Sequence, residues 1–190
     1  MKLYSYVVEH DLGRKPNPYF DVCTLCGCKC RSSRGKPRNV EELAIEGDWI
    51  VGTGGANPRK SAGHGKLVYA MRVDEKLTRE KYYADPRFAK KRVETSSQGD
   101  NKRPGDRFER REQFVLISRH FYYFGAGAID IPETFVKLGL EKRGPGFRRD
   151  FPDVAGFVAW IETQKPGKHG EPCMKPMDKS KGSNRCKSSS

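Results

Sequence analysis

The chain has 190 residues, which suits one domain of ordinary size, and its net charge of +13 and pI of about 9.6 favour a polyanionic partner, most often nucleic acid. No apolar run approaches the roughly 18 residues of a membrane span, and the polar first residues do not form a signal peptide, so we expect a cytoplasmic protein without membrane contacts. In that compartment the six cysteines are expected to be reduced, metal-bound or reactive rather than joined in disulfides.

The N-terminal segment predicts a strand followed by a rigid loop. Residues 2–8 alternate in polarity and carry Tyr, Val and Leu, which indicates a strand. In Pro16-Asn17-Pro18 each residue before a proline is kept out of the helical region, so Asn17 is held in one position. Its amide offers both a donor and an acceptor, as the edge of a base requires.

Four cysteines within eight residues form the next feature, and they allow three interpretations. The first pair has the C-x-x-C spacing that can bind one tetrahedral metal, which makes zinc a candidate. A redox thiol pair is the second interpretation, and buried small residues in a loop are the third. The candidate metal ligands are Cys23, Cys26, Cys28 and Cys30.

A basic segment without acidic residues follows the cysteines. Ser and Gly keep it flexible, which suits contacts to phosphates because these depend on charge rather than on shape. The alternative is a solvated basic loop without a partner. The candidate phosphate contacts are Lys29, Arg31, Arg34, Lys36 and Arg38.

Residues 47–55 predict the central hairpin of the domain. Gly47-Asp48 suits a turn, Trp49-Ile50-Val51 suits a buried strand, and three glycines then remove side chains from the backbone. The apolar run 66–73 can pair back against this strand across the loop 56–65. Trp49 is then either a core residue or part of a pocket for a flat ligand. The pocket interpretation groups Asn17, Trp49, Thr53 and Gly54.

The remaining elements are short. Asn39 and Thr78 are expected to cap helices that begin at residues 40 and 79, and further helices are expected over 132–138 and 153–163. Residues 113–118 and 120–124 predict strands, whose rings pack in the core or, at Tyr122, stack on a base. Residues 89–112 are expected to form an exposed insertion. We expect one domain over residues 1–164 and a basic, disordered tail over 165–190.

Several blocks of the chain, in order, resemble the nucleotide modification associated domain family, type 2, of bacteria and phages. The blocks are Glu9–Gly13, Pro16-Asn17-Pro18, Cys23-Thr24-Leu25, Gly47–Thr53, Lys66–Val73, Gly99-Asp100-Asn101, Leu116-Ile117-Ser118 and Phe121–Gly125. This resemblance covers residues 3–162 and implies a role in the modification of DNA bases. A more distant resemblance to PUA-like domains, which read modified bases, implies an α+β fold: a small mixed β-barrel or curved sheet with short flanking helices.

Three functions remain open at this point. The first is a domain that binds a base, nucleotide or nucleic acid. The second is an enzyme that modifies a base, with Cys23 or Cys28 as nucleophile, Asp100 or Asp48 as acid–base group and His120 or His64 as proton carrier. The third is a metal-stabilised structural module. The chain has no phosphate-binding loop of the G-x-x-x-x-G-K type and no dinucleotide fingerprint, which favours the binding domain.

Overall fold

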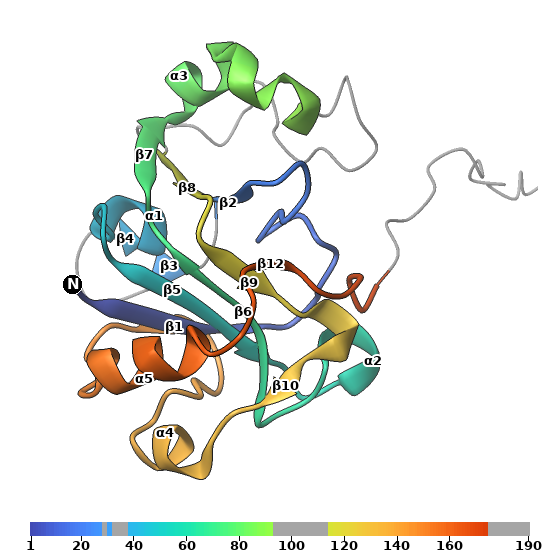
Figure 1. The fold of residues 1–190 in the computed structure, drawn as a ribbon, viewed down its shortest axis with the longest axis vertical. Coiled ribbons are helices and arrows are strands. Elements are labelled where there is room, and N and C mark those ends of the chain that lie inside the picture. Colours follow the sequence, from blue (N-terminus) through green and yellow to red (C-terminus); the bar gives the residue numbers. More distant parts are fainter. Residues whose placement is uncertain (28–29, 32–37, 93–113, 175–190) are drawn as a thin grey trace, which may run out of the picture.

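The protein is described by a computed structural model that places residues 1–27, 30–31, 38–92 and 114–174 (Figure 1). A mixed main sheet has the strand order β11-β1-β5-β6-β9-β12, with β10 also paired to β6, and a second sheet has the order β2-β8-β7. The main sheet contains β1 (Leu3–Val8), β5 (Trp49–Gly54), β6 (Lys66–Arg72), β9 (Phe121–Tyr123), β10 (Ile129–Asp130), β11 (Phe147–Arg148) and β12 (Gly167–Lys168). The second sheet contains β2 (Cys23–Cys26), β7 (Glu75–Thr78) and β8 (Phe114–Ser118), and β3 (Cys30–Arg31) pairs with β4 (Arg38–Asn39).

The helices are short and begin where the sequence places capping residues. The Asn39 side chain accepts a hydrogen bond from the Glu42 N–H at 2.8 Å, and Thr78 accepts one from the Lys81 N–H at 3.3 Å. Both predicted caps are therefore confirmed. The helices are α1 (Val40–Leu43), α2 (Pro58–Ser61), α3 (Arg79–Ala84), α4 (Glu133–Lys137) and α5 (Val154–Ile161), with 3₁₀ turns η1 (Pro86–Lys91) and η2 (Gly125–Gly127).

The predicted α+β class is confirmed, whereas the β-barrel is not formed by the residues that the structure describes. Their main sheet is open, because its path ends at β11 on one side and at β12 on the other. Each of these edge strands has only two residues, which offers few backbone groups for closing the sheet.

The central hairpin forms as predicted and divides the core into two faces. β5 pairs antiparallel with β6, and it also pairs parallel with β1. Because successive side chains of a strand point to opposite faces, Trp49 and Val51 face α4 and α5, while Ile50 faces the second sheet and α1. A third apolar cluster, around Tyr82 and Phe88, supports the second sheet.

Two expected segments fall only partly within the described residues. Residues 89–91 of the expected insertion end η1, while residues 93–112 lie outside the description. Residues 165–174 of the expected tail are described and contribute β12, which pairs parallel with β9. Residues 175–190 lie outside the described part.

Candidate functional site

The structure places Trp49 in the interior, where its ring is enclosed by other rings. Its exposed fraction is 1%, and it lies 6.4 Å from the Tyr122 ring and 6.2 Å from the Phe157 ring, centroid to centroid. A base could reach this ring only if α5 or β9 moved. The indole therefore packs as a core residue in this conformation, as the first of the two interpretations expected.

The other residues of the expected pocket are not brought to Trp49. Gly54 lies five residues further along β5, about 16 Å away. A side chain at Gly54 would overlap the carbonyl oxygen of Gly63, so this glycine makes room for its own loop. The buried Thr53 hydroxyl donates to the Tyr6 carbonyl at 3.3 Å. Asn17 pairs with Thr24, which places it beside β2 in the second sheet.

One corner beside Trp49 does bring candidate residues together. The His120 ring meets Trp49 edge-on at 5.6 Å, and its Nε2 lies 3.2 Å from the Tyr122 hydroxyl and 3.4 Å from the Glu162 carboxylate. Burial, and then the charge of Glu162, raise the pKa of Tyr122, so this phenol stays protonated. The His120 side chain is 27% exposed, so this corner is accessible from solvent.

The cysteine candidates do not share one face. Cys23 is fully buried in the cluster that contains Tyr69, whereas Cys26 packs against the cluster around Phe88 on the opposite side of β2. Within the described residues no three His, Cys, Asp or Glu side chains gather as metal ligands. Cys28 and the side chain of Cys30 lie outside the description, so a metal site of all four cysteines stays a prediction that the Cys23–Cys26 geometry does not favour.

A lysine that the sequence analysis did not select lies deep inside the structure. Lys91 is 1% exposed, and its ammonium donates to the Asn17 carbonyl at 3.0 Å and to the Asn17 side-chain oxygen at 2.8 Å. The rigid Pro16-Asn17-Pro18 loop thus holds a buried cation. Nothing in the pair Lys90-Lys91 indicates which residue points inward, because the orientation of η1 decides it.

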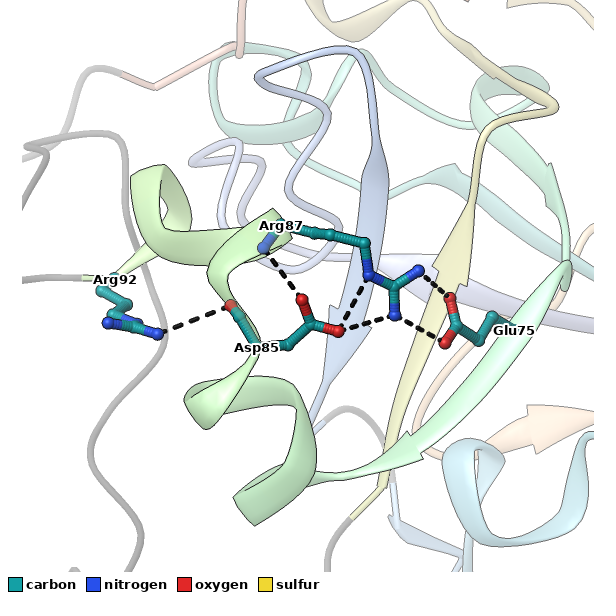
Figure 2. Close-up of polar contacts among 4 residues, drawn as sticks. All are labelled: Glu75, Asp85, Arg87 and Arg92. Atoms are coloured by element: carbon teal, nitrogen blue, oxygen red, sulfur yellow. Dashed lines mark hydrogen bonds and ion pairs between the residues drawn. The ribbon is translucent and has the colours of Figure 1, made fainter.

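An ionic clamp on the surface fixes η1 against the second sheet (Figure 2). The Arg87 guanidinium donates to both carboxylate oxygens of Glu75, at 2.9 and 3.0 Å, and to Asp85 at 2.6 and 2.8 Å. Hydrogen bonds from Arg87 lower the pKa of Asp85, which keeps this carboxylate ionised. The clamp therefore sets the start of the turn that carries Lys91 inward.

A second buried polar group lies on the face of the main sheet that carries Tyr6, Tyr69 and Tyr123, which we call the tyrosine face. Asp11 is only 1% exposed. Its carboxylate accepts hydrogen bonds from the Tyr123 hydroxyl at 2.6 Å and from the Gly13 and Cys173 N–H groups, each at 3.2 Å. Burial, and then the charge of Asp11, raise the pKa of Tyr123 far above its usual value. Tyr123 is therefore a permanent donor to Asp11.

Both strongly basic segments of the chain start beside the same loop, residues 9–15. Gly27, which precedes the basic segment 28–38, accepts a hydrogen bond through its carbonyl from the Lys15 ammonium at 3.4 Å. Met174, which precedes the basic segment 175–190, donates to the Asp11 carbonyl at 2.9 Å. The N–H of Asp11 donates to the carbonyl of Lys60 in α2 at 2.8 Å. Segment 28–38 has five basic residues and no acidic residue, and segment 175–190 has five basic residues and one acidic residue.

Comparison with known protein families matches residues 1–113 and 93–180 to the family described as nucleotide modification associated domain 2. The chain belongs to this family. The resemblance noted in the sequence is therefore confirmed, and the family name associates this nucleotide modification associated domain with nucleotides or nucleic acid. No curated protein and no solved structure matches the chain.

The remaining candidates of this nucleotide modification associated domain lie apart from the groups above. Asp48 is buried and accepts hydrogen bonds from the Lys2 and Ile45 N–H groups, which is a structural role at the turn before β5. His64 lies 3.2 Å from Glu141 on a different loop. The backbones of Arg31 and Arg38 are paired in the β3–β4 ladder, while Asp100, Lys29, Arg34 and Lys36 lie outside the described residues. In the described ranges no helix has the length and apolar character needed to span a membrane.

Proposed function

We propose that this domain binds nucleic acid and presents it for base modification, with the loop 9–15 and α2 at the centre of its phosphate-binding surface. The observation that supports this proposal is that the two basic segments 28–38 and 175–190 both start at this loop. Exposed Lys15, Arg59 and Lys60 add fixed positive charge there, and Glu9 is the exposed acidic side chain of the same loop. Phosphate contacts of this kind give affinity without sequence preference.

One surface of the domain would then hold the nucleic acid to which the expected phosphate contacts bind. Segment 28–38, which carries Arg31, Arg34 and Arg38, begins after Gly27, whose carbonyl accepts from the Lys15 ammonium, and segment 175–190 begins after Met174, whose N–H donates to the Asp11 carbonyl. A strand of nucleic acid lying across residues 9–15 would lie beside Gly27 and Met174, after which the two basic segments begin. We expect such a domain, of bacterial or phage origin, to work in the bacterial cytoplasm as a reader of bases in the manner of PUA-like domains.

The test compares two triple variants in binding to a double-stranded oligonucleotide over a range of salt concentrations. Changing Lys15, Arg59 and Lys60 to Ala should weaken binding at low salt and reduce the salt slope by about 0.9 for each phosphate that the variant no longer neutralises. The control changes the exposed residues Lys81, Arg119 and Lys137 to Ala, which removes the same charge elsewhere. Equal losses of affinity in the two variants would mean that net charge alone acts, and would overturn the proposed surface.

The His120 corner supports a second candidate function, an enzyme that modifies a base. There a half-buried imidazole lies between a protonated phenol and a carboxylate, which is the arrangement of a proton carrier. The check is mass spectrometry of nucleosides after DNA has been incubated with the protein. A mass change should be lost in His120→Gln and kept in the matched control His64→Gln. A change that survives His120→Gln would exclude this corner as the acid–base site.

A further inference from the structure

Residues 165–174, which we call the strap, run across the domain without being buried in it. β12 pairs with β9, the His169 N–H donates to the Tyr123 carbonyl at 2.7 Å, and the Glu171 carbonyl accepts from the Ala126 N–H at 2.8 Å. None of the residues 165–174 is buried, so little apolar surface holds the strap in place. Backbone hydrogen bonds attach it, together with the His169 ring, which stacks on the Phe124 ring at 5.3 Å, centroid to centroid.

The domain is shaped to accept the strap closely. A side chain at Gly125 would overlap the Glu171 carbonyl, and one at Gly170 would overlap the Phe124 carbonyl. A side chain at Gly13 would meet the Pro172 ring at 2.5 Å. Three glycines, two on the domain and one on the strap, therefore allow the two backbones to approach.

At its end the strap presents two adjacent N–H donors to one buried residue. The Cys173 N–H donates to the Asp11 carboxylate at 3.2 Å, and the Met174 N–H donates to the Asp11 carbonyl at 2.9 Å. Nearby, the Lys168 ammonium lies 5.3 Å from the centre of the half-buried Tyr19 ring. If the strap moved away, the Asp11 carboxylate and the Asp11 carbonyl would each lose one hydrogen-bond donor. The nearby Tyr19 ring would lose its contact with the Lys168 ammonium.

We propose that the strap occupies, within the same chain, a base-binding site formed by Asp11 and Tyr19. The ligand must replace what the strap supplies: a flat cationic or aromatic contact on Tyr19 and two adjacent N–H donors on Asp11. Among the ordinary bases, guanine has two adjacent donors on one edge, N1–H and the N2 amino group. Stacking on Tyr19 and hydrogen bonding to Asp11 together select guanine over bases that have one donor or none at the same spacing.

This inference rests on the proposed nucleic-acid function and deepens it. A guanine turned out of a strand would enter the Asp11–Tyr19 site while the phosphates lie on the loop 9–15, which carries Asp11 itself. The strap would then compete with the base for Asp11 and Tyr19.

The experiment opens the strap in the full chain with Gly170→Ala, because the added Cβ would overlap the Phe124 carbonyl. The control is Gly127→Ala, a glycine of the same region at which an added Cβ would meet nothing within 4 Å. Hydrogen exchange of the His169 and Cys173 N–H groups reports opening, and thermal melting reports folding. The probes are GMP, CMP, AMP and TMP, measured by calorimetry.

In Gly170→Ala the hydrogen exchange should become faster. GMP should bind about tenfold more tightly than in the wild type if the strap covers the site in about nine tenths of the wild-type molecules, because the apparent affinity falls with the open fraction. CMP, AMP and TMP should gain less. Adding Tyr19→Ala should abolish the gain for GMP. Gly127→Ala should match the wild type.

Three results would overturn the inference. They are equal gains for all four nucleotides, faster exchange without any gain, and exchange that Gly170→Ala leaves unchanged, which would make the strap a fixed part of the domain. Oligonucleotide binding measured on the same proteins separates the two proposals. Salt-dependent binding of DNA with no selective gain for GMP would leave the phosphate surface standing and refute only the base site.

Discussion

The two faces of the main sheet are covered in different ways. On one face Trp49 and Val51 pack against Phe135 of α4 and Phe157 of α5, so apolar contacts close it. On the other face Tyr6, Tyr69 and Tyr123 stand in one row across the sheet, and each hydroxyl needs a partner. An apolar face can be closed by any helix of suitable shape, whereas a row of phenols requires specific acceptors. That requirement makes the tyrosine face the more sensitive of the two to the exact position of each side chain.

One glycine makes the tyrosine row possible. Gly52 lies between Tyr6 and Tyr69 in the strand register, and a side chain there would overlap the Tyr69 ring. Because Gly52 has no side chain, the Tyr6 and Tyr69 hydroxyls can meet over β5, at 2.6 Å. The comparison of the two faces thus predicts different responses to substitution, which the following experiments measure.

The largest effect is expected on the apolar face. Trp49→Ala should lower the free energy of unfolding by about 3–5 kcal/mol, because the cavity is enclosed by rings that cannot collapse fully. Urea denaturation measures the loss. Leu138→Ala, at a side chain that is 40% exposed, is the control and should change stability much less. A loss below about 1 kcal/mol for Trp49→Ala would contradict the packing described for this face.

The next effect concerns the glycine of the tyrosine face. Gly52→Ala should cost up to about 3 kcal/mol, because the Tyr69 ring must move and its hydrogen bond with Tyr6 breaks. The same change in a Tyr69→Leu background should cost less. A double-mutant cycle of these two substitutions measures their coupling. Additive losses of stability would show that Gly52 and Tyr69 do not compete for space.

A smaller effect tests the buried acid. Tyr123→Phe removes one of three donors to Asp11 and should cost about 1.5 kcal/mol near neutral pH. Because the folded pKa of Tyr123 is raised, its contribution is complete below the unfolded value of about 10 and is lost as the pH rises further. The stability difference between wild type and Tyr123→Phe should therefore shrink above pH 10. A difference that grows in alkali would contradict the raised pKa.

The smallest effect is expected at the Arg87 clamp, away from both faces. Arg87→Met should lower the melting temperature slightly at low salt and leave it unchanged at high salt, because salt screens exposed ion pairs. Lys137→Met, which breaks the exposed pair with Glu133, is the control. A loss of stability that persists at high salt would show that Arg87 acts through its packing on Phe88 instead.

The elements with a local signal could be predicted from the sequence, whereas the buried contacts between distant segments could not. The caps at Asn39 and Thr78 and the hairpin of β5 and β6 follow from residues close together in the chain. β7 and β12 were missed because Glu75–Thr78 is only half buried and Gly167–Lys168 is held by its backbone, so neither shows an apolar pattern.

The buried polar pairs that the sequence did not indicate depend on contacts between distant parts of the chain. The hydrogen bond from Tyr123 to Asp11 spans 112 positions, and that from Lys91 to Asn17 spans 74. The segment Pro16-Asn17-Pro18 indicated a fixed Asn17, but only the position of η1 shows that its oxygens hold a buried ammonium. Trp49 was open to both interpretations because the sequence does not show that Phe157, more than a hundred residues later, covers its ring.

The pairing of β12 with β9 also bears on how the protein is made. Strand β9 keeps an outer row of unpaired backbone groups until residues 167–168 have left the ribosome, which follows the synthesis of every other strand that the structure describes. An unpaired strand edge invites pairing with another chain, and this risk is greatest while many copies are being synthesised together. The strap residues are therefore expected to shield the nascent domain from self-association, and slow synthesis between residues 123 and 167 would prolong its exposure.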